Sequence, residues 1–152
     1  MAALKVGAKA PEFALPTGDG GIVSLKDLRG KKVVLFFYPK DDTPGCTKEA
    51  CSFRDNITKV VKKNAVVIGI SVDSPESHKK FSDKFGLPFA LASDARKEVV
   101  KKYGVWKQKS MYGRKYMGTE RTTVVIDEQG VVTHIFEKVK VDGHTDEVLG
   151  SL

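Results

Sequence analysis

Residues 31–39, "KKVVLFFYP", give the strongest indication of the fold. Two lysines are followed by a run of apolar residues, rich in β-branched and aromatic side chains and without polar alternation. Such a run is typical of a strand buried on both faces of a sheet. Residues 64–73, "NAVVIGISVD", repeat the pattern, and a helical segment at about 46–63 separates the two. The order strand, helix, strand predicts a βαβ unit with parallel strands.

The segments on either side extend this unit. On the N-terminal side, "FAL" and "GIVSL" flank the turn-rich "PTGDGG" and predict a small hairpin over residues 13–25. On the C-terminal side we expect a helix at about 75–85, capped by Ser74. After it come, in order, a strand in "PFALASD", a helix in "ARKEVVKKYG", strands in "RTTVVID" and "GVVTHIFE", and a terminal helix in "GHTDEVLGSL".

These elements predict an α/β sandwich with a mixed central sheet, helices on both faces and a small N-terminal hairpin. The 152 residues have the length of one ordinary domain, so we expect a single domain over 1–152. The longest apolar run, residues 33–38, is far too short to cross a bilayer. The start, "MAALKVGAKAPEF", lacks the apolar stretch of a secretory signal. We therefore expect a soluble, cytoplasmic protein that binds no membrane. The alternative is an organellar protein whose transit peptide has been removed, since its removal would leave no trace in the sequence.

The net charge of +7 raises the question of a nucleic-acid partner. The lysines occur singly or in scattered pairs, which is typical of a solvated surface. Residues 101–116, "KKYGVWKQKSMYGRKY", are denser and interleave basic with aromatic side chains, a pattern that can bind single strands. No recognised nucleic-acid motif accompanies it, so we interpret the segment as a loop and expect no nucleic acid. A basic nucleic-acid-binding module remains the alternative from a different functional class.

The chain has two cysteines, Cys46 and Cys51. Two are too few for a disulfide-stabilised secreted fold, and the chain is too long to need one. A structural zinc site requires four ligands in paired spacings, which two cysteines and three scattered histidines do not provide. We therefore expect no metal site and interpret the histidines as surface or hydrogen-bonded core residues.

Cys46 falls at the start of the first predicted helix, directly after a buried strand. At 100° per residue one stripe of this helix is apolar and is expected to face the sheet. Its members are Cys46, Ala50, Phe53, Ile57, Val60 and Val61. In open α/β sheets ligands bind at the carboxyl ends of strands. The free N–H groups and the dipole at the start of a helix favour an anion, so a thiol at Cys46 should ionise more easily than a free cysteine. Cysteine is also a common small core residue, but the turn "DDTPG" before it argues against that interpretation.

Cys51 lies about 140° around the same helix from Cys46 and about 7.5 Å further along its axis. Together with the helix radius this gives a Cα–Cα distance of about 8.6 Å, whereas a disulfide requires less than about 7 Å. Either the two thiols never bond, or the helix opens to let them.

The stretch "PKDDTPGC" matches the pattern Pro-x-x-x-Thr-x-x-Cys at Pro39, Thr43 and Cys46, and it resembles the active-site signature of peroxiredoxins. The continuation "CTKEACSFRD" resembles the Q-type, or bacterioferritin comigratory, branch, in which a resolving cysteine often follows five residues after the first. Five further segments resemble family segments in the same order, so the resemblance covers nearly the whole chain. They are "GAKAPEFAL", "VVIGISVDSPESHKKF", "FALASD", "KKYGVW" and "RTTVVIDEQGVV".

The resemblance implies a thioredoxin-like fold and the reduction of hydroperoxides without a metal or an organic cofactor. It implies that Cys46 is the peroxidatic nucleophile and Cys51 the resolving cysteine, joined in an intrachain disulfide that a thioredoxin-type dithiol reduces. It also implies that Thr43 and Arg121 position the peroxide and that Pro39 shields the pocket. Because resolution within one chain needs no partner chain, we expect a monomer.

Several alternatives stay open on the residues alone. Residues 43–45 could be only a turn, and Arg121 only a surface residue beside a strand. Glu49, in the first turns of the helix, could pair with the backbone or with an arginine. A thioredoxin-like disulfide oxidoreductase is the second enzymatic reading, but that activity usually requires Cys-x-x-Cys, and the four-residue gap here weighs against it.

Overall fold

The computed structural model describes residues 4–152 and contains a five-stranded mixed sheet in the order β5-β4-β3-β8-β9. At its centre β3 (Lys32–Phe37) runs parallel to β4 (Ala65–Ser71), which runs parallel to β5 (Ala90–Ser93). On the other side of β3, β8 (Thr122–Ile126) and β9 (Val132–Phe136) are antiparallel. The predicted βαβ unit and the predicted pair of C-terminal strands are both confirmed.

The alternating side chains of β3 supply two separate hydrophobic cores. Val33, Leu35 and Phe37 point to one face, and Val34 and Phe36 point to the other. All five are at most 1% exposed. A strand buried on both faces needs apolar residues at every position, which is why the run at 33–38 lacks polar alternation.

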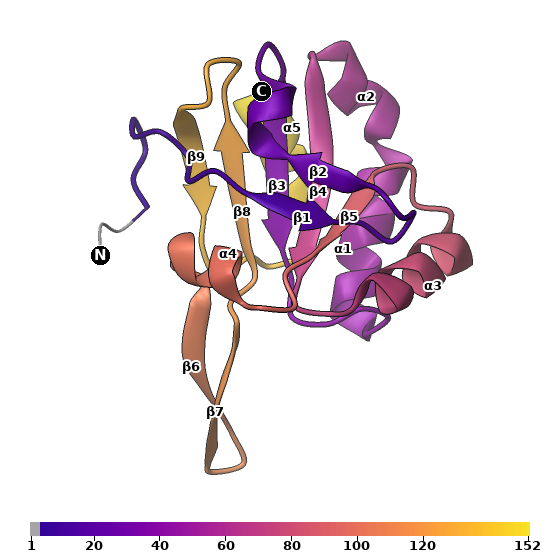
Figure 1. Cartoon of the computed structure of the whole chain (residues 1–152), viewed down its shortest axis with the longest axis vertical. Coiled ribbons are helices and arrows are strands. Elements are labelled where there is room, and N and C mark those ends of the chain that lie inside the picture. Colours follow the sequence, from indigo (N-terminus) through magenta and orange to yellow (C-terminus); the bar gives the residue numbers. More distant parts are fainter. Residues whose placement is uncertain (1–3) are drawn as a thin grey trace.

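Helices cover both faces of the sheet, as predicted. One core packs against α1 (Pro44–Asp55), α2 (Ile57–Lys62), α3 (Pro75–Phe85) and α5 (His144–Ser151). The other packs against the hairpin of β1 (Ala14–Pro16) and β2 (Ile22–Ser24), the 3₁₀ helix η1 (Leu25–Leu28) and α4 (Glu98–Lys102). Figure 1 shows the β1–β2 hairpin in front of the sheet and α5 behind it.

The first helix differs from the prediction in one respect. The segment expected as a single helix at about 46–63 begins at Pro44 and breaks at Asn56 into α1 and α2. The Asn56 side chain donates to the carbonyl of Ser52 at 2.8 Å, and this kind of side-chain bond competes with a continuous helix. The break changes which side chains of α2 face the sheet. Val61, predicted to lie on the buried stripe, is therefore 62% exposed. The prediction for Val61 was wrong for that reason.

The helix at 75–85 is confirmed, and its cap is the predicted one. Ser74 is the N-cap of α3, and its hydroxyl oxygen accepts from the Ser77 N–H at 3.2 Å. The next helix, α4, is shorter than "ARKEVVKKYG" suggests, because Lys97 at its start has a left-handed backbone with a φ of 63°. No helix among residues 4–152 is both long enough and apolar enough to cross a membrane.

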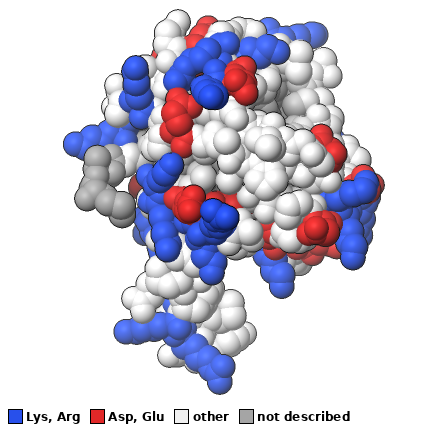
Figure 2. Space-filling view, in the orientation of Figure 1, with Lys and Arg blue, Asp and Glu red and all other residues white. Residues whose placement is uncertain are grey.

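Residues 101–116, interpreted as a loop, contain most of a second hairpin. β6 (Trp106–Met111) and β7 (Arg114–Thr119) pair antiparallel, and Tyr112 and Gly113 join them with positive φ angles of 52° and 77°. Two consecutive left-handed residues are the geometry of a tight type I′ hairpin turn. Figure 1 shows this hairpin extending away from the sheet, and Figure 2 shows basic side chains along it as well as scattered over the rest of that face. Because most of its side chains are exposed, its strands lack the apolar alternation that would have revealed them.

Candidate active site

The sequence places Cys46 in the first turn of α1, directly beyond the carboxyl end of β3. Thr43 is the N-cap residue, and Pro44 occupies the first helical position, where a missing N–H costs nothing. Cys46 is 1% exposed, and Pro39 and Thr43 are partly buried in the connection between β3 and α1. The three residues of the quoted motif are thus gathered within one strand-to-helix connection.

Arg121 directly precedes β8, the antiparallel neighbour of β3, and its side chain reaches this connection from there. In the antiparallel pairing of β3 with β8, Thr122 lies opposite Phe37, so Arg121 falls beside the start of the loop that leads to Cys46. Its Nη2 donates to the Cys46 Sγ at 3.3 Å, and its Nη1 donates to the Glu49 Oε1 at 2.7 Å. One planar guanidinium therefore joins two side chains on one face of α1. The reading of Arg121 as a surface residue is excluded, and Glu49 pairs with an arginine rather than with the backbone.

Gly45 is a residue of this site that the sequence did not single out. A Cβ atom on Gly45 would lie 3.1 Å from the Nη2 of Arg121, closer than most real side-chain contacts. The absence of a side chain lets the guanidinium approach the start of α1. Glycine is a poor residue for a helix, and its place one residue before Cys46 was the available signal.

Burial and neighbouring charges shift the pKa values of Arg121 and Glu49 in opposite directions. Burial opposes the charge of Arg121, but Glu49 and Cys46 outweigh it and raise the pKa of Arg121 above its ordinary value. Burial raises the pKa of Glu49 from 4.5 to about 7, although Arg121 opposes the rise. The second oxygen of Glu49, Oε2, is buried and has no hydrogen-bond partner among the described residues, so a proton can reside there.

The Glu49 carboxyl should make folding stability depend on pH. A carboxyl whose pKa is raised on folding binds more protons in the folded state, so its contribution to the free energy of unfolding declines as pH rises from about 4.5 to about 7. We expect Glu49→Gln to remove this decline, which amounts to about 3 kcal/mol for a shift of this size. Urea unfolding of both proteins across this range measures it, with Glu76→Gln, an exposed position on α3, as the matched control. Equal pH slopes in wild type and Glu49→Gln would show that Glu49 does not titrate in this way.

Cys51 lies in the same uninterrupted helix, half-buried, and both cysteines are free thiols. Ideal helix geometry separates their Cα atoms by about 8.6 Å, beyond the reach of a disulfide. The structure brings Arg121 into direct contact with Cys46 and Glu49, and it leaves Cys51 unbonded to Cys46.

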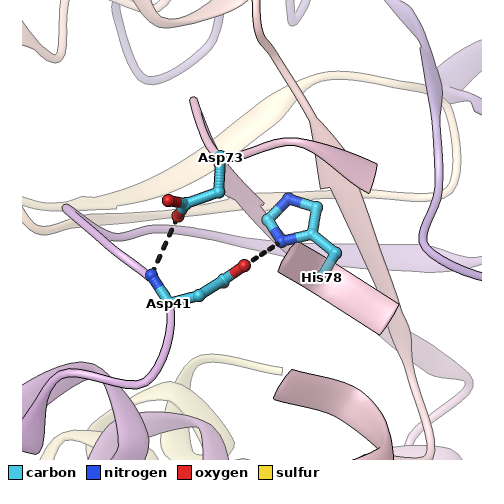
Figure 3. Close-up of side chains that lie close together, drawn as sticks. All are labelled: Asp41, Asp73 and His78. Atoms are coloured by element: carbon cyan, nitrogen blue, oxygen red, sulfur yellow. Dashed lines mark hydrogen bonds and ion pairs between the residues drawn. The ribbon is translucent and has the colours of Figure 1, made fainter. Parts of the chain in front are cut away.

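The histidines fit the expected surface and core roles. His78 is fully buried and bonded to Asp41 and to the carbonyl of Ala92, and His144 is buried and bonded to Thr123. His134 is exposed. Figure 3 shows His78 and Asp73 converging on Asp41, a cluster that the sequence did not reveal.

Comparison with known proteins decides the family. The AhpC/TSA family matches residues 6–135. The chain belongs to the AhpC/TSA family. A putative peroxiredoxin Bcp of Coxiella burnetii is 56% identical over 149 residues, covering 98% of this chain and 99% of that protein. Peroxiredoxin Bcp of Bacillus subtilis is 46% identical over 149 residues, covering 98% and 95%.

Solved structures of AhpC/TSA proteins confirm the thioredoxin-like fold. The bacterioferritin comigratory protein of Xanthomonas campestris, studied for alkyl peroxide reduction, is 37% identical, with a TM-score of 0.89 over 99% of this chain and 96% of that one. A Cys-to-Ser mutant of PrxQ from Xylella fastidiosa is 33% identical, with a TM-score of 0.93 over 99% and 96%. The resemblance to Q-type peroxiredoxins is thereby confirmed, and this AhpC/TSA protein is a thiol-dependent peroxidase.

Proposed function

We propose that Cys46 is the peroxidatic nucleophile and Cys51 the resolving cysteine of this peroxidase. The observation that carries the proposal is the Arg121 guanidinium, which donates to the buried Cys46 sulfur at the start of α1. A fixed cation at this position stabilises the thiolate, which is the reactive form of cysteine. Of the two cysteines, Cys46 is the one whose sulfur accepts this hydrogen bond.

The reaction proceeds in three steps. The Cys46 thiolate attacks the terminal oxygen of a hydroperoxide, the O–O bond breaks, and the remainder leaves as an alcohol, or as water, after taking a proton. Cys46 becomes a sulfenic acid. The Cys51 thiolate then attacks that sulfur, an S–S bond forms, the S–O bond breaks, and the hydroxide leaves as water after taking a proton. An external dithiol reduces the disulfide by exchange, restores both thiols and is itself oxidised.

The surrounding residues serve the first step. Arg121 stabilises the negative charge that develops on the departing oxygen, and the backbone N–H groups at the start of α1 act in the same direction. Thr43, the N-cap residue of α1, contributes a hydroxyl that positions the peroxide. Pro39, which has no N–H, ends the strand and shields the site from water.

The substrates are hydrogen peroxide and organic hydroperoxides, in keeping with the alkyl peroxide reduction described for the Xanthomonas relative. The reductant is a thioredoxin-type dithiol. The protein acts as a cytoplasmic monomer without metal, organic cofactor, nucleic acid or membrane. Resolution within one chain supports the monomer, and the scattering of basic side chains over the face in Figure 2 argues against a nucleic-acid partner.

Mass spectrometry tests the proposal directly. The reduced protein should take up two alkylating groups, and after one equivalent of hydrogen peroxide it should take up none and contain a Cys46–Cys51 disulfide. Continuous peroxide consumption with dithiothreitol or thioredoxin should follow, whereas insulin reduction should be slow, which separates a peroxidase from a disulfide oxidoreductase. Two free thiols after peroxide treatment would exclude the proposed function.

Oxidation should unwind the first turns of α1. An intact helix holds the two Cα atoms about 8.6 Å apart, so the disulfide requires backbone movement. The start of α1 is the natural place to open, since its first N–H groups have no partners within the helix. The motion withdraws Ala50 and Phe53, both fully buried, from the core.

Hydrogen exchange on the reduced and disulfide forms measures this motion. Protection at residues 46–54 should collapse on oxidation, while the strands at 33–38 and 65–72 stay protected. Equal protection of the α1 amides in both forms would contradict the geometric argument.

A further inference from the structure

The peptide unit between Lys40 and Asp41 is held from both sides. Its carbonyl, on Lys40, accepts the hydroxyl proton of Thr43 at 2.8 Å. Its N–H, on Asp41, donates to the Asp73 Oδ2 at 2.8 Å, as Figure 3 shows. Because a peptide unit is planar, fixing the N–H fixes the direction of the carbonyl. Asp73, just beyond β4, therefore sets the acceptor to which Thr43 gives its proton.

The Asp41 side chain is held equally firmly. Its Oδ1 accepts from the Tyr38 hydroxyl at 2.6 Å, and its Oδ2 accepts from the Ser77 hydroxyl at 2.8 Å and lies 2.7 Å from the His78 Nδ1. The side chain of Asp41 is 3% exposed. Burial, with Asp41 beside it, raises the pKa of Tyr38 well above its ordinary value, so this hydroxyl keeps its proton.

His78 is held at both ring nitrogens. Its Nε2 lies 3.0 Å from the Ala92 carbonyl, which can only accept, so this nitrogen donates. Its Nδ1 lies 2.7 Å from the same Asp41 oxygen to which Ser77 donates. The charged groups that face the ring are Asp41 and, beyond it, Asp73. The His78–Asp41 pair is buried, and it ties α3 to the loop before α1.

We propose that Asp73 and the buried His78–Asp41 pair are positioning residues for Thr43. They fix the Lys40–Asp41 peptide, so the Thr43 hydroxyl donates its proton to the Lys40 carbonyl. The Thr43 oxygen is then free to accept a hydrogen bond from the O–H of the hydroperoxide. That O–H belongs to the oxygen that Cys46 attacks, so its direction aligns the O–O bond with the sulfur. The inference rests on the proposed function and adds the residues that orient its substrate.

A double-mutant cycle tests whether Asp73 and His78 act through Thr43. Asp73→Ala frees the peptide N–H, and we expect the second-order rate of Cys46 oxidation by hydrogen peroxide to fall about tenfold, the scale of one hydrogen bond. In a Thr43→Val background, which lacks the hydroxyl, the same substitution should change the rate less than about twofold. His78→Gln should behave likewise, and Glu76→Ala, exposed on the same helix, serves as the control. A merely structural role would slow both backgrounds equally, and that result, or an unchanged rate in Asp73→Ala, would overturn the inference.

The His78–Asp41 pair can be measured on the unmodified protein, so the test does not depend on a variant that folds. NMR of the imidazole ring should show a ring N–H protected from exchange with solvent, and free exchange of the ring N–H would overturn the buried pair. Failure of the wild-type Cys46 to react with peroxide would instead refute the proposed function. A reactive wild type with equal losses in both backgrounds would refute only the positioning role.

Discussion

Replacing Cys46 with serine should abolish peroxide turnover entirely. A serine hydroxyl in this place has no reactive anion near neutral pH, and no other cysteine sulfur accepts a hydrogen bond from Arg121 among the described residues. Cys51→Ser should behave differently, because the nucleophile remains. It should consume one equivalent of peroxide and then stop as a sulfenic acid at Cys46. Peroxide consumption with thioredoxin and mass spectrometry of the stalled protein measure the two outcomes.

The pair of variants separates the roles because the residues share one helix. Both substitutions exchange sulfur for oxygen, so similar thermal stabilities would assign the difference in turnover to chemistry rather than to folding. Full multiple turnover by Cys46→Ser, or a Cys51→Ser protein that turns over with thioredoxin as fast as wild type, would reverse or remove the assignment.

The sheet could be predicted because its signal is local. Residues 33–38 are apolar at every position, and the structure shows why: alternate side chains enter two different cores. The hairpin at 106–119 lacked that signal, since most of its side chains are exposed and face no core. The break at Asn56 depends on one side-chain bond to Ser52, a detail that helical periodicity does not register.

The site was harder to predict, because its residues are distant in sequence. Arg121 and Cys46 are 75 positions apart, and only the register of β3 with β8 brings them together. Spacing alone left Arg121 open as a surface residue, and the resemblance to peroxiredoxins supplied its role. His78 on α3 and Asp41 in the loop after β3 are 37 positions apart and likewise meet only in the fold. The catalytic roles of Arg121, Pro39, Thr43 and the two cysteines are predictions that variants of these residues test.

Substituting Arg121 with methionine should slow the reaction of Cys46 with peroxide by about 10²–10³, the scale of losing one donor to a developing negative charge. Methionine retains much of the bulk but removes the charged fork that spans the Cys46 sulfur and the Glu49 carboxylate. Arg121→Lys keeps the charge without the planar fork, so its rate of reaction with peroxide should lie between those of wild type and Arg121→Met. Stopped-flow measurement of the first, single-turnover step reports the loss, with Arg96→Met, an exposed arginine, as control.

The buried partner of Arg121 decides whether that loss reflects chemistry or folding. Without Arg121, Glu49 loses the one cation that opposes the rise of its pKa, so it should take up a proton and remain buried as a neutral acid. The fold should therefore survive, and the double variant Arg121→Met/Glu49→Gln, which has no charge to bury, should react as slowly as Arg121→Met alone. Recovery of the rate in the double variant would show that the single variant was slow because of the unpaired carboxyl. A rate within about threefold of wild type in Arg121→Met corresponds to less than about 1 kcal/mol and would remove Arg121 from the catalytic machinery.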